Sequence, residues 1–509
     1  MKKILTFLLM FSMTFLLISC DFLDSLTSST TEAITGVPTT INEDTESSIE
    51  TTIEVTTIVD TTTEEVTTTE VTTIPVTTVP ETTTEATTQP TTETTSETTT
   101  QNTNEPIIPT GYNLVQDETY WDGIPTIGTP KVLVFVVDFP DSQIQNDAEV
   151  LSDMEIAFNG SDTEIDYESL NSYYLKSSYG QLDLTADIFG VYTADYNASY
   201  YEQQYETEYS DSDLVYEIVE AYSTQIDYSN YDYDNDGMID GIYIIYNKSY
   251  DFDSEIWWAY QTIYMYNGDE FNGVEPLFFT WCSLDFFYDN PSEEIDARTV
   301  IHETGHMLGL DDYYDYYEGD IYNNSGGLDG IDMMDSTMGD HNPFSKILLG
   351  WVTPYVVEQS MTVDIAPFIE AGNVILLIDE WNDTIFDEYI LISFYTPTGL
   401  NEADRYYLFS NPGVVMFHVD ARLGNTTSEY YPSIYTYNNT DTEFMLIKYI
   451  EKSIQTSTSV NNADLFLIGD SFGDVIYSDY TWHDGSYVAI IITIEYIDDE
   501  KATINIDFN

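Results

Sequence analysis

Basic residues are scarce in this chain, which contains 12 Lys+Arg against 91 Asp+Glu and carries a formal net charge of −79. Nucleic acids and anionic lipid surfaces are bound through basic patches, so this balance argues against both kinds of partner. The acidic surface instead favours solubility and attracts cations. The 509 residues suffice for two or three domains with a sizeable core, and the 43 tyrosines favour strands and aromatic packing.

Cysteine is almost absent, with only Cys20 and Cys282 in the chain. Two lysines, an apolar run and small residues precede Cys20, which is typical of a secretory signal and too short for a convincing membrane span. The ending "LISC" resembles a bacterial lipoprotein signal, so we predict a signal peptide over 1–19 and a lipid on Cys20; the alternative is an ordinary signal peptide. Cys282 is then left without a disulfide partner and is interpreted as a small buried apolar residue.

Aromatic residues are nearly missing from the threonine-rich segment after Phe22, and no Lys or Arg occurs between Lys3 and Lys131. Such a segment cannot bury enough apolar surface to offset the entropy of ordering. We therefore predict a disordered stalk over 20–105, open to O-glycosylation on threonine. The lipid and the stalk together would hold a monomeric folded part away from the extracellular face of a bacterial membrane.

The remainder of the chain is expected to fold as two regions. Lys131–Phe139 is a continuous apolar run typical of a buried strand, and it is followed by a helix ending near Ser177. Further strands and helices alternate up to the histidine-bearing helix, which indicates an α+β catalytic domain over 106–355. Seven short apolar or alternating runs after Pro354 predict an all-β, sandwich-like region over 356–509.

Histidine is also scarce, yet two of the five histidines lie four residues apart in "TVIHETGHMLGLDDYYDYY". On a helix His302 and His306 share one face, so both imidazoles can reach one zinc ion. Glu303 between them would take a proton from zinc-bound water. Gly309 can adopt the positive φ that ends the helix, and Asp312 can then supply the third ligand. Three protein ligands leave a fourth position for water, as a catalytic zinc requires.

Two features of this zinc site stay open at the level of the residues. The third ligand is Asp312 by spacing, with Asp311 and Asp315 as alternatives. A Gly/Asp-rich turn downstream, "GGLDGIDMMDSTMGDHNPF", could place a methionine as a hydrophobic floor under the ligands. Met334 is the first candidate and Met333 the second, while an ordinary core methionine remains the alternative.

The combined pattern "HETGHMLGLDD" and "DMMDSTMGDHNPFSKILLGW" resembles the immune inhibitor A family of secreted bacterial zinc metallopeptidases. The resemblance covers roughly Ile107 to the C-terminus and is looser beyond about Asp420. It implies a metzincin-like fold with a twisted mixed sheet, one catalytic zinc ion and endopeptidase activity on extracellular proteins. The roles it implies are zinc ligation by His302, His306 and Asp312, general base catalysis by Glu303, and a Met-turn at Met334. The chain departs from the family in having the stalk where a pro-domain would stand, and a longer, more acidic turn after Met334.

A second metal site is expected in "DYDNDGMID", where acidic residues recur at alternate positions as in a calcium loop. The ligands would be the side chains of Asp232, Asp234, Asp236 and Asp240 and the backbone carbonyl of Met238. The twelfth position holds a tyrosine instead of glutamate, so another acid would have to complete the shell. The alternative is a solvated acidic turn.

The other three histidines, His341, His418 and His483, are interpreted as structural. A substrate strand is expected to pair with a sheet edge formed by Leu277–Phe287. The competing hypotheses are a catalytically inactive surface-binding or adhesion protein on the same scaffold, and a zinc hydrolase that acts on a non-peptide amide.

Overall fold

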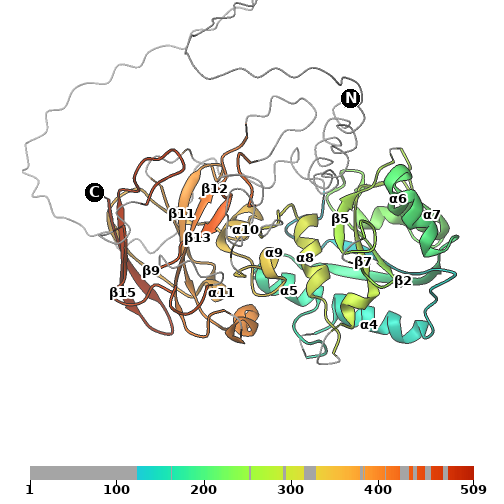
Figure 1. Cartoon of the computed structure of the whole chain (residues 1–509), viewed down its shortest axis with the longest axis horizontal. Coiled ribbons are helices and arrows are strands. Elements are labelled where there is room, and N and C mark those ends of the chain that lie inside the picture. Colours follow the sequence, from blue (N-terminus) through green and yellow to red (C-terminus); the bar gives the residue numbers. More distant parts are fainter. Residues whose placement is uncertain are drawn as a thin grey trace, which may run out of the picture. The chain divides into compact units, whose positions relative to one another are not determined.

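The computed structural model shows a mixed α/β fold built from several sheets and helices (Figure 1). It describes residues 123–161, 163–251, 254–266, 268–289, 294–314, 328, 330–378, 382, 384–406, 408–424, 435–439, 444–452, 460–473 and 480–508. The predicted signal peptide, Cys20 and the stalk lie outside this part of the chain. None of the helices in the described ranges is both long and apolar enough to cross a membrane.

The first sheet has five strands in the order β2-β1-β4-β7-β5. These strands are β1 (Lys131–Asp138), β2 (Thr185–Thr193), β4 (Ile242–Tyr246), β5 (Tyr260–Ile263) and β7 (Phe278–Ser283). The first four strands of that order run parallel to one another, and β5 pairs antiparallel to β7. The sheet is therefore mixed, and its antiparallel member stands at one edge.

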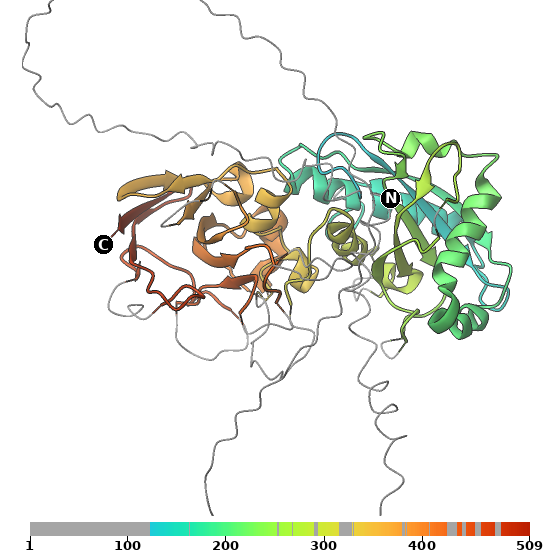
Figure 2. The same ribbon diagram turned by 90° about the horizontal axis from the view of Figure 1, so that it is seen from above.

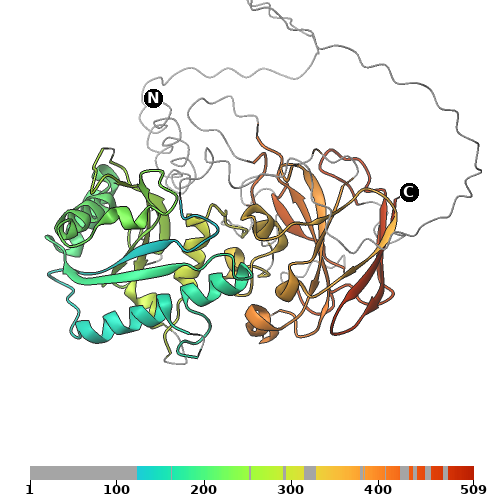
Figure 3. The ribbon, with the colours of Figure 1, turned by 180° about the vertical axis from the view of Figure 1, so that it is seen from behind.

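Strand β1 is buried on both faces, which explains its continuous apolar sequence. Val134 and Val136 belong to one hydrophobic cluster, whereas Leu133 and Phe135 belong to another on the opposite face. The helices that contribute residues to the first cluster include α4 (Asp147–Asn159), α5 (Leu170–Ser177) and α8 (Arg298–Met307). The second cluster is covered by α6 (Ala198–Glu208) and α7 (Ser210–Tyr222), as Figure 3 shows.

Helix α5 illustrates how local sequence sets the ends of these elements. The Ser169 hydroxyl accepts the backbone N–H of Ser172 at 3.1 Å, and the Ser172 hydroxyl accepts that of Ser169 at 2.9 Å. This capping box begins the helix. Gly180 follows its end at φ +78°, where its N–H donates to the Leu175 carbonyl at 2.7 Å. The helix expected to end near Ser177 is therefore confirmed.

The predicted substrate edge is wrong. Leu277–Phe287 contains β7, which lies between β4 and β5, and ends in the 3₁₀ helix η3 (Leu284–Phe287). Every residue of β7 is buried, as expected for an interior strand, whereas three of the four residues of β5 are only half-buried. A fully apolar run signals the inside of a sheet rather than its edge. The edge nearest helix α8 is β5.

Residues after 355 form two further sheets (Figure 2). The first has the order β13-β12-β11-β10-β8 and contains β8 (Tyr355–Val357), β10 (Val374–Leu377), β11 (Glu388–Tyr395), β12 (Gly413–Asp420) and β13 (Ile447–Tyr449). The second has the order β14-β15-β16-β9 and contains β9 (Met361–Ile365), β14 (Ser471–Phe472), β15 (Ile490–Ile497) and β16 (Ala502–Phe508). Side chains from both sheets, such as Ile392 and Ile504, share one hydrophobic cluster.

Each of the seven runs expected to form strands after Pro354 contains one. The region is nevertheless β-rich rather than all-β, because it includes the helix α11 (Phe368–Ala371) and the 3₁₀ helix η4 (Gly399–Tyr406). Gly372 ends α11 at φ +63°. Four residues are too few to show helical periodicity in the sequence, so α11 carries no recognisable signal.

Candidate metal centre

Helix α8 carries the two histidines of the zinc motif and ends as the motif requires. The Leu308 N–H donates to the Thr304 carbonyl at 3.0 Å, and Gly309 then adopts φ +94°. The Leu310 N–H returns to the Gly305 carbonyl at 3.0 Å, which satisfies one of the last carbonyls of the helix. This left-handed turn sends the following residues back along the face of α8.

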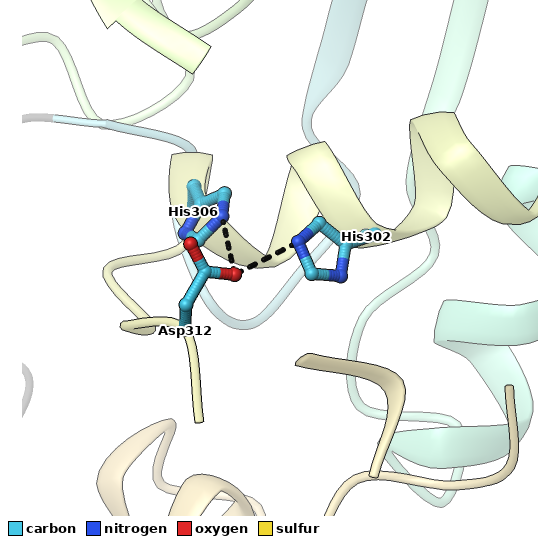
Figure 4. A group of neighbouring side chains, drawn as sticks. All are labelled: His302, His306 and Asp312. Carbon is cyan, nitrogen blue, oxygen red and sulfur yellow. Dashed lines mark ion pairs between the residues drawn. The ribbon is translucent and has the colours of Figure 1, made fainter. Parts of the chain in front are cut away.

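The turn brings Asp312 directly to the two histidines (Figure 4). One carboxylate oxygen, Oδ1 of Asp312, lies 3.0 Å from Nε2 of His302 and 3.3 Å from Nε2 of His306. Zinc bonds of about 2.0–2.2 Å in a tetrahedron separate neighbouring ligand atoms by roughly 3.3 Å. The three side chains, called the α8 site below, therefore match the donor set and spacing of a zinc centre.

The other nitrogen of each imidazole is engaged by the backbone. Nδ1 of His302 lies 2.8 Å from the Met333 carbonyl, and Nδ1 of His306 lies 2.8 Å from the Leu310 carbonyl. A carbonyl can only accept, so both Nδ1 atoms carry a proton. In the neutral rings the lone pair is then on Nε2, the atom that faces Asp312, and this is the tautomer that a metal ligand needs.

Charge balance also favours a cation at this position. Burial lowers the pKa of both histidines, but the hydrogen bonds and charge of Asp312 outweigh it, and the pKa of His306 rises to about 10. Burial alone would raise the pKa of Asp312, yet the two histidines hold it well below its usual range. Protons thus supply the positive charge that a divalent ion would supply when bound.

Glu303 lies in the same helix and is buried. Burial raises its pKa, and the two histidines together with a backbone hydrogen bond from Gln261 of β5 offset only part of that rise. The next residue, Thr304, bonds through its hydroxyl to the Tyr243 hydroxyl at 2.7 Å. Glu303 is thereby fixed between the metal ligands and the edge strand, as a general base would have to be.

Met334 lies against the helix between the two histidines. A Cβ atom built on Gly305 would stand 2.2 Å from its sulfur, so only glycine fits at that point of α8. Met334 belongs to the short helix α9 (Met333–Ser336), and the side chain of the preceding N-cap residue, Asp332, accepts the Met334 N–H at 2.7 Å. The neighbouring Met333 contributes through its carbonyl rather than its side chain. Sequence reasoning missed Gly305, although a glycine inside a helical motif is itself a signal of close packing.

The segment that supplies Asp312 is held from three directions through Tyr313. Its N–H donates to the Met334 carbonyl at 3.0 Å, and its hydroxyl bonds to that of Ser345, in α10 (Pro343–Leu348), at 2.9 Å. Its carbonyl accepts from the side-chain amide of Asn439 at 2.9 Å, and the same amide group also bonds to Ile447 of β13. The segment that carries Asp312 is thus attached both to helix α9, which carries Met334, and to the β-rich region.

The alternatives to Asp312 do not join the ligand group. Asp311 is not among the three grouped side chains, and burial raises its pKa to about 6. Asp315 lies outside the described residues. His341 is also separate: it is buried edge-on against Tyr173 at 5.5 Å between ring centroids, with Nδ1 3.9 Å from Asp332.

The acidic loop before β4 is only partly assembled in the expected way. Asp232, Asp234 and Asp240 each bring a carboxylate oxygen within 4.8 Å of the others. Asp236 does not join this group; its Oδ1 instead accepts the N–H of Met238 at 2.7 Å. The loop follows the 3₁₀ helix η2 (Tyr228–Tyr231) and ends where Met238 begins β3 (Met238–Ile239). Strand β3 pairs with β6 (Glu275–Pro276).

Asp240 shows why this loop suits a cation. Burial raises its pKa to about 8, and the nearby charges of Asp234, Asp232 and Asp236 add to the rise. One carboxylate oxygen of Asp232 is buried without a hydrogen-bond partner. Buried carboxylate oxygens that crowd together in this way are the ligands that Ca²⁺ prefers.

The α8 site can hold one divalent cation and places a buried carboxylate beside it. The structure brings His302, His306 and Asp312 together and places Glu303 on the same helix, while their roles and the family resemblance stay predictions. The chain matches no protein-family model and no curated protein.

Proposed function

We propose that this protein is a zinc-dependent endopeptidase that hydrolyses peptide bonds of extracellular proteins. The observation that supports it most strongly is the placement of one Asp312 oxygen between the Nε2 atoms of His302 and His306, with Glu303 buried on the same helix. A site that only binds a cation has no use for that additional buried carboxylate. The finer metzincin-like assignment rests on the same four residues.

His302, His306 and Asp312 would hold the zinc ion. When bound, zinc polarises the scissile carbonyl and lowers the pKa of water towards neutrality. Glu303 then accepts the proton of the attacking water and delivers it to the leaving nitrogen. Its raised pKa suits this exchange, because a base poised closer to neutral pH both takes and returns a proton readily.

The substrate is proposed to lie along β5 instead of β7. Among the described strands none pairs with the outer side of β5, so an extended peptide can add there as a further strand. Gln261 of β5 also donates its N–H to Glu303, which places this edge next to the base. A peptide bound on β5 would therefore run past the zinc ligands.

The proposed location is the extracellular face of a bacterial membrane, and it rests on the signal sequence and Cys20 alone. Radiolabelled palmitate should enter the wild-type chain during expression in a bacterial host but not a Cys20→Ala chain. Equal labelling of both chains would exclude Cys20 as the lipid attachment site.

The decisive test of the activity compares the full chain with its Glu303→Gln variant on casein. We expect the substitution to reduce kcat/KM by roughly 10²–10⁴-fold while the zinc content is unchanged, because only proton transfer is lost. Glu358→Gln, at an exposed position away from the site, is the matched control. A wild-type chain that binds zinc but cleaves neither casein nor gelatin would instead indicate a surface-binding protein.

A further inference from the structure

A second cluster of metal-ligating side chains lies in the β-rich region, far along the chain from α8. It consists of Glu388 at the start of β11, His418 and Asp420 on β12, and His483 in the segment between β14 and β15. Together with the α8 site it contains four of the five histidines of the protein. We call these four residues the β11–β12 cluster.

One ligand atom each of Glu388, His418 and His483 lies within 4.8 Å of the other two, and Asp420 adjoins this group through His483. Nε2 of His418 lies 2.9 Å from Oε1 of Glu388, and Nδ1 of His483 lies 2.7 Å from Oδ2 of Asp420. Nδ1 of His483 is also 3.9 Å from the same Glu388 oxygen. These separations are similar to the 3.0 and 3.3 Å found in the α8 site, so a small expansion would admit a zinc ion.

The sheet places two carboxylates directly across from each other at this point. Glu388 and Asp420 are cross-strand partners in the β11–β12 pairing, and their side chains are 8% and 0% exposed. Opposed like charges destabilise a sheet unless a cation separates them. Arg422 supplies one positive charge: its Nε donates to Oδ1 of Asp420 at 2.7 Å, and its Nη2 lies 3.1 Å from Oε2 of Glu388.

Arg422 also bonds through Nη2 to Oδ2 of Asp420, the oxygen that faces His483, whereas Oε1 of Glu388 faces His418. Its single positive charge balances one of the two carboxylates, so the four residues and Arg422 carry a net charge of −1 when the imidazoles are neutral. A divalent ion would therefore meet an excess of negative charge.

Both imidazoles are held in place by aromatic neighbours. Nδ1 of His418 lies 3.1 Å from the Tyr480 hydroxyl, and Trp482 packs edge-on against the same ring at 5.6 Å between centroids. His483 stacks on Phe444 at 4.3 Å with an interplanar angle of 18°. Metal-ligating histidines are commonly oriented through their second nitrogen in this way.

We propose that Glu388, His418 and His483 bind a second divalent transition-metal ion, of which zinc is the best match. Two imidazole nitrogens and one carboxylate oxygen suit zinc better than calcium or magnesium. The ion would join β11 and β12 to the segment that carries His483, and Asp420 would stand beside it through its hydrogen bond with His483. Metal binding by Nε2 of His418 requires that the proton of the neutral ring is on Nδ1, where it can be donated to the Tyr480 hydroxyl.

The chain contains few enough histidines for the test to be a direct metal count. The full chain, freed of metal and re-equilibrated with zinc, should contain two zinc ions by mass spectrometry of the metal. His302→Ala/His306→Ala removes the α8 site and should leave one zinc ion per chain. Adding His483→Ala to that double variant should remove the remaining ion, whereas adding Tyr487→Ala, at an exposed position in the same segment, should not.

The β11–β12 cluster is left intact in the His302→Ala/His306→Ala chain, so this variant decides the proposal even if substitutions within the cluster prevent folding. Cobalt added to it should give the visible absorption of a four-coordinate site, and zinc should raise its Tm. A folded double variant that retains less than about a tenth of a zinc ion, with Tm unmoved by zinc, would overturn the proposal. The cluster would then be a hydrogen-bonded ion network, and the peptidase proposal would be unaffected.

Discussion

The α8 site and the β11–β12 cluster combine similar ligand atoms at similar distances but differ in the charged residue that stands beside the ligands. Beside the α8 site this residue is Glu303, a buried acid that can exchange a proton. Beside the cluster it is Arg422, a permanent cation that forms ion pairs with Glu388 and Asp420. In the proposed assignments, the charged group beside the ligands therefore distinguishes a site proposed for catalysis from a site proposed for metal binding alone.

The largest expected effect concerns the third ligand of the α8 site. Asp312→Ala should lower kcat/KM on casein by about a thousand-fold, equivalent to about 4 kcal/mol, because the remaining two ligands cannot retain zinc. Asp311→Ala is the matched neighbour and should keep both the metal and most of the activity. If Asp311→Ala lost zinc instead, the ligand assignment would have to be exchanged between the two positions.

The acidic loop offers a contrast to both histidine sites, since it has only oxygen ligands. Burial raises the pKa of Asp240 to about 8 in the folded chain, against an ordinary value of 3.8. Between these values the folded state holds a proton that the unfolded state has lost, so calcium-free stability falls as pH rises from 4 to 8.

Calcium replaces that proton, and its stabilising effect should therefore be greater at pH 8 than at pH 5, by roughly 3 kcal/mol. Urea unfolding of the full chain at both pH values, with calcium or with chelator, measures the difference. Asp240→Asn should flatten the pH dependence and weaken the calcium response. A calcium effect of the same size at both pH values would contradict the role assigned to Asp240.

The packing under α8 predicts a smaller, purely structural effect. Gly305→Ala forces a Cβ atom to within 2.2 Å of the Met334 sulfur and should reduce the free energy of unfolding by about 2 kcal/mol. In a double-mutant cycle, Gly305→Ala should cost little once Met334 is already alanine. If the losses in the free energy of unfolding were additive, position 305 and Met334 would not contact each other.

The smallest effect is expected in the β11–β12 cluster. Tyr480→Phe removes the hydroxyl that orients His418 and should weaken zinc binding about tenfold, or about 1.4 kcal/mol, in the His302→Ala/His306→Ala chain. A competition assay with a zinc chelator measures the affinity. Casein hydrolysis by the otherwise wild-type chain should not respond, and a loss there would couple the two centres in a way that the proposal does not include.

The two proposed metal sites also show how much of a site the sequence can reveal. The proximity of His302 and His306 was predictable because residues four apart on a helix share one face. Gly309 indicated the turn that brings Asp312 to them. Glu388, His418 and His483 come from separate strands and loops, so their proximity depends on strand pairing. Such pairing is a tertiary property that short-range patterns do not encode.

The same reasoning accounts for the misplaced substrate edge. The strand content of Leu277–Phe287 was predictable from its apolar residues, but its position in the sheet was not. Strand order depends on which neighbours bury each face and edge of a strand. Strand β5 is short and its residues are mostly half-buried and polar, so its sequence does not show the apolar pattern that predicts a strand. Local sequence thus fixed the identity of the elements here, while long-range pairing fixed their order.

The hydrogen bond from Asn439 to the Tyr313 carbonyl bears on how this protein can be divided into pieces. Asp312 is the residue before Tyr313, so an amide in the β-rich region helps to set the position of a proposed zinc ligand. A fragment cut after residue 355 would lose that support for the segment that carries Asp312. The two regions would then have to be inherited together, and recombination that exchanged the β-rich region alone is expected to abolish the proposed peptidase activity.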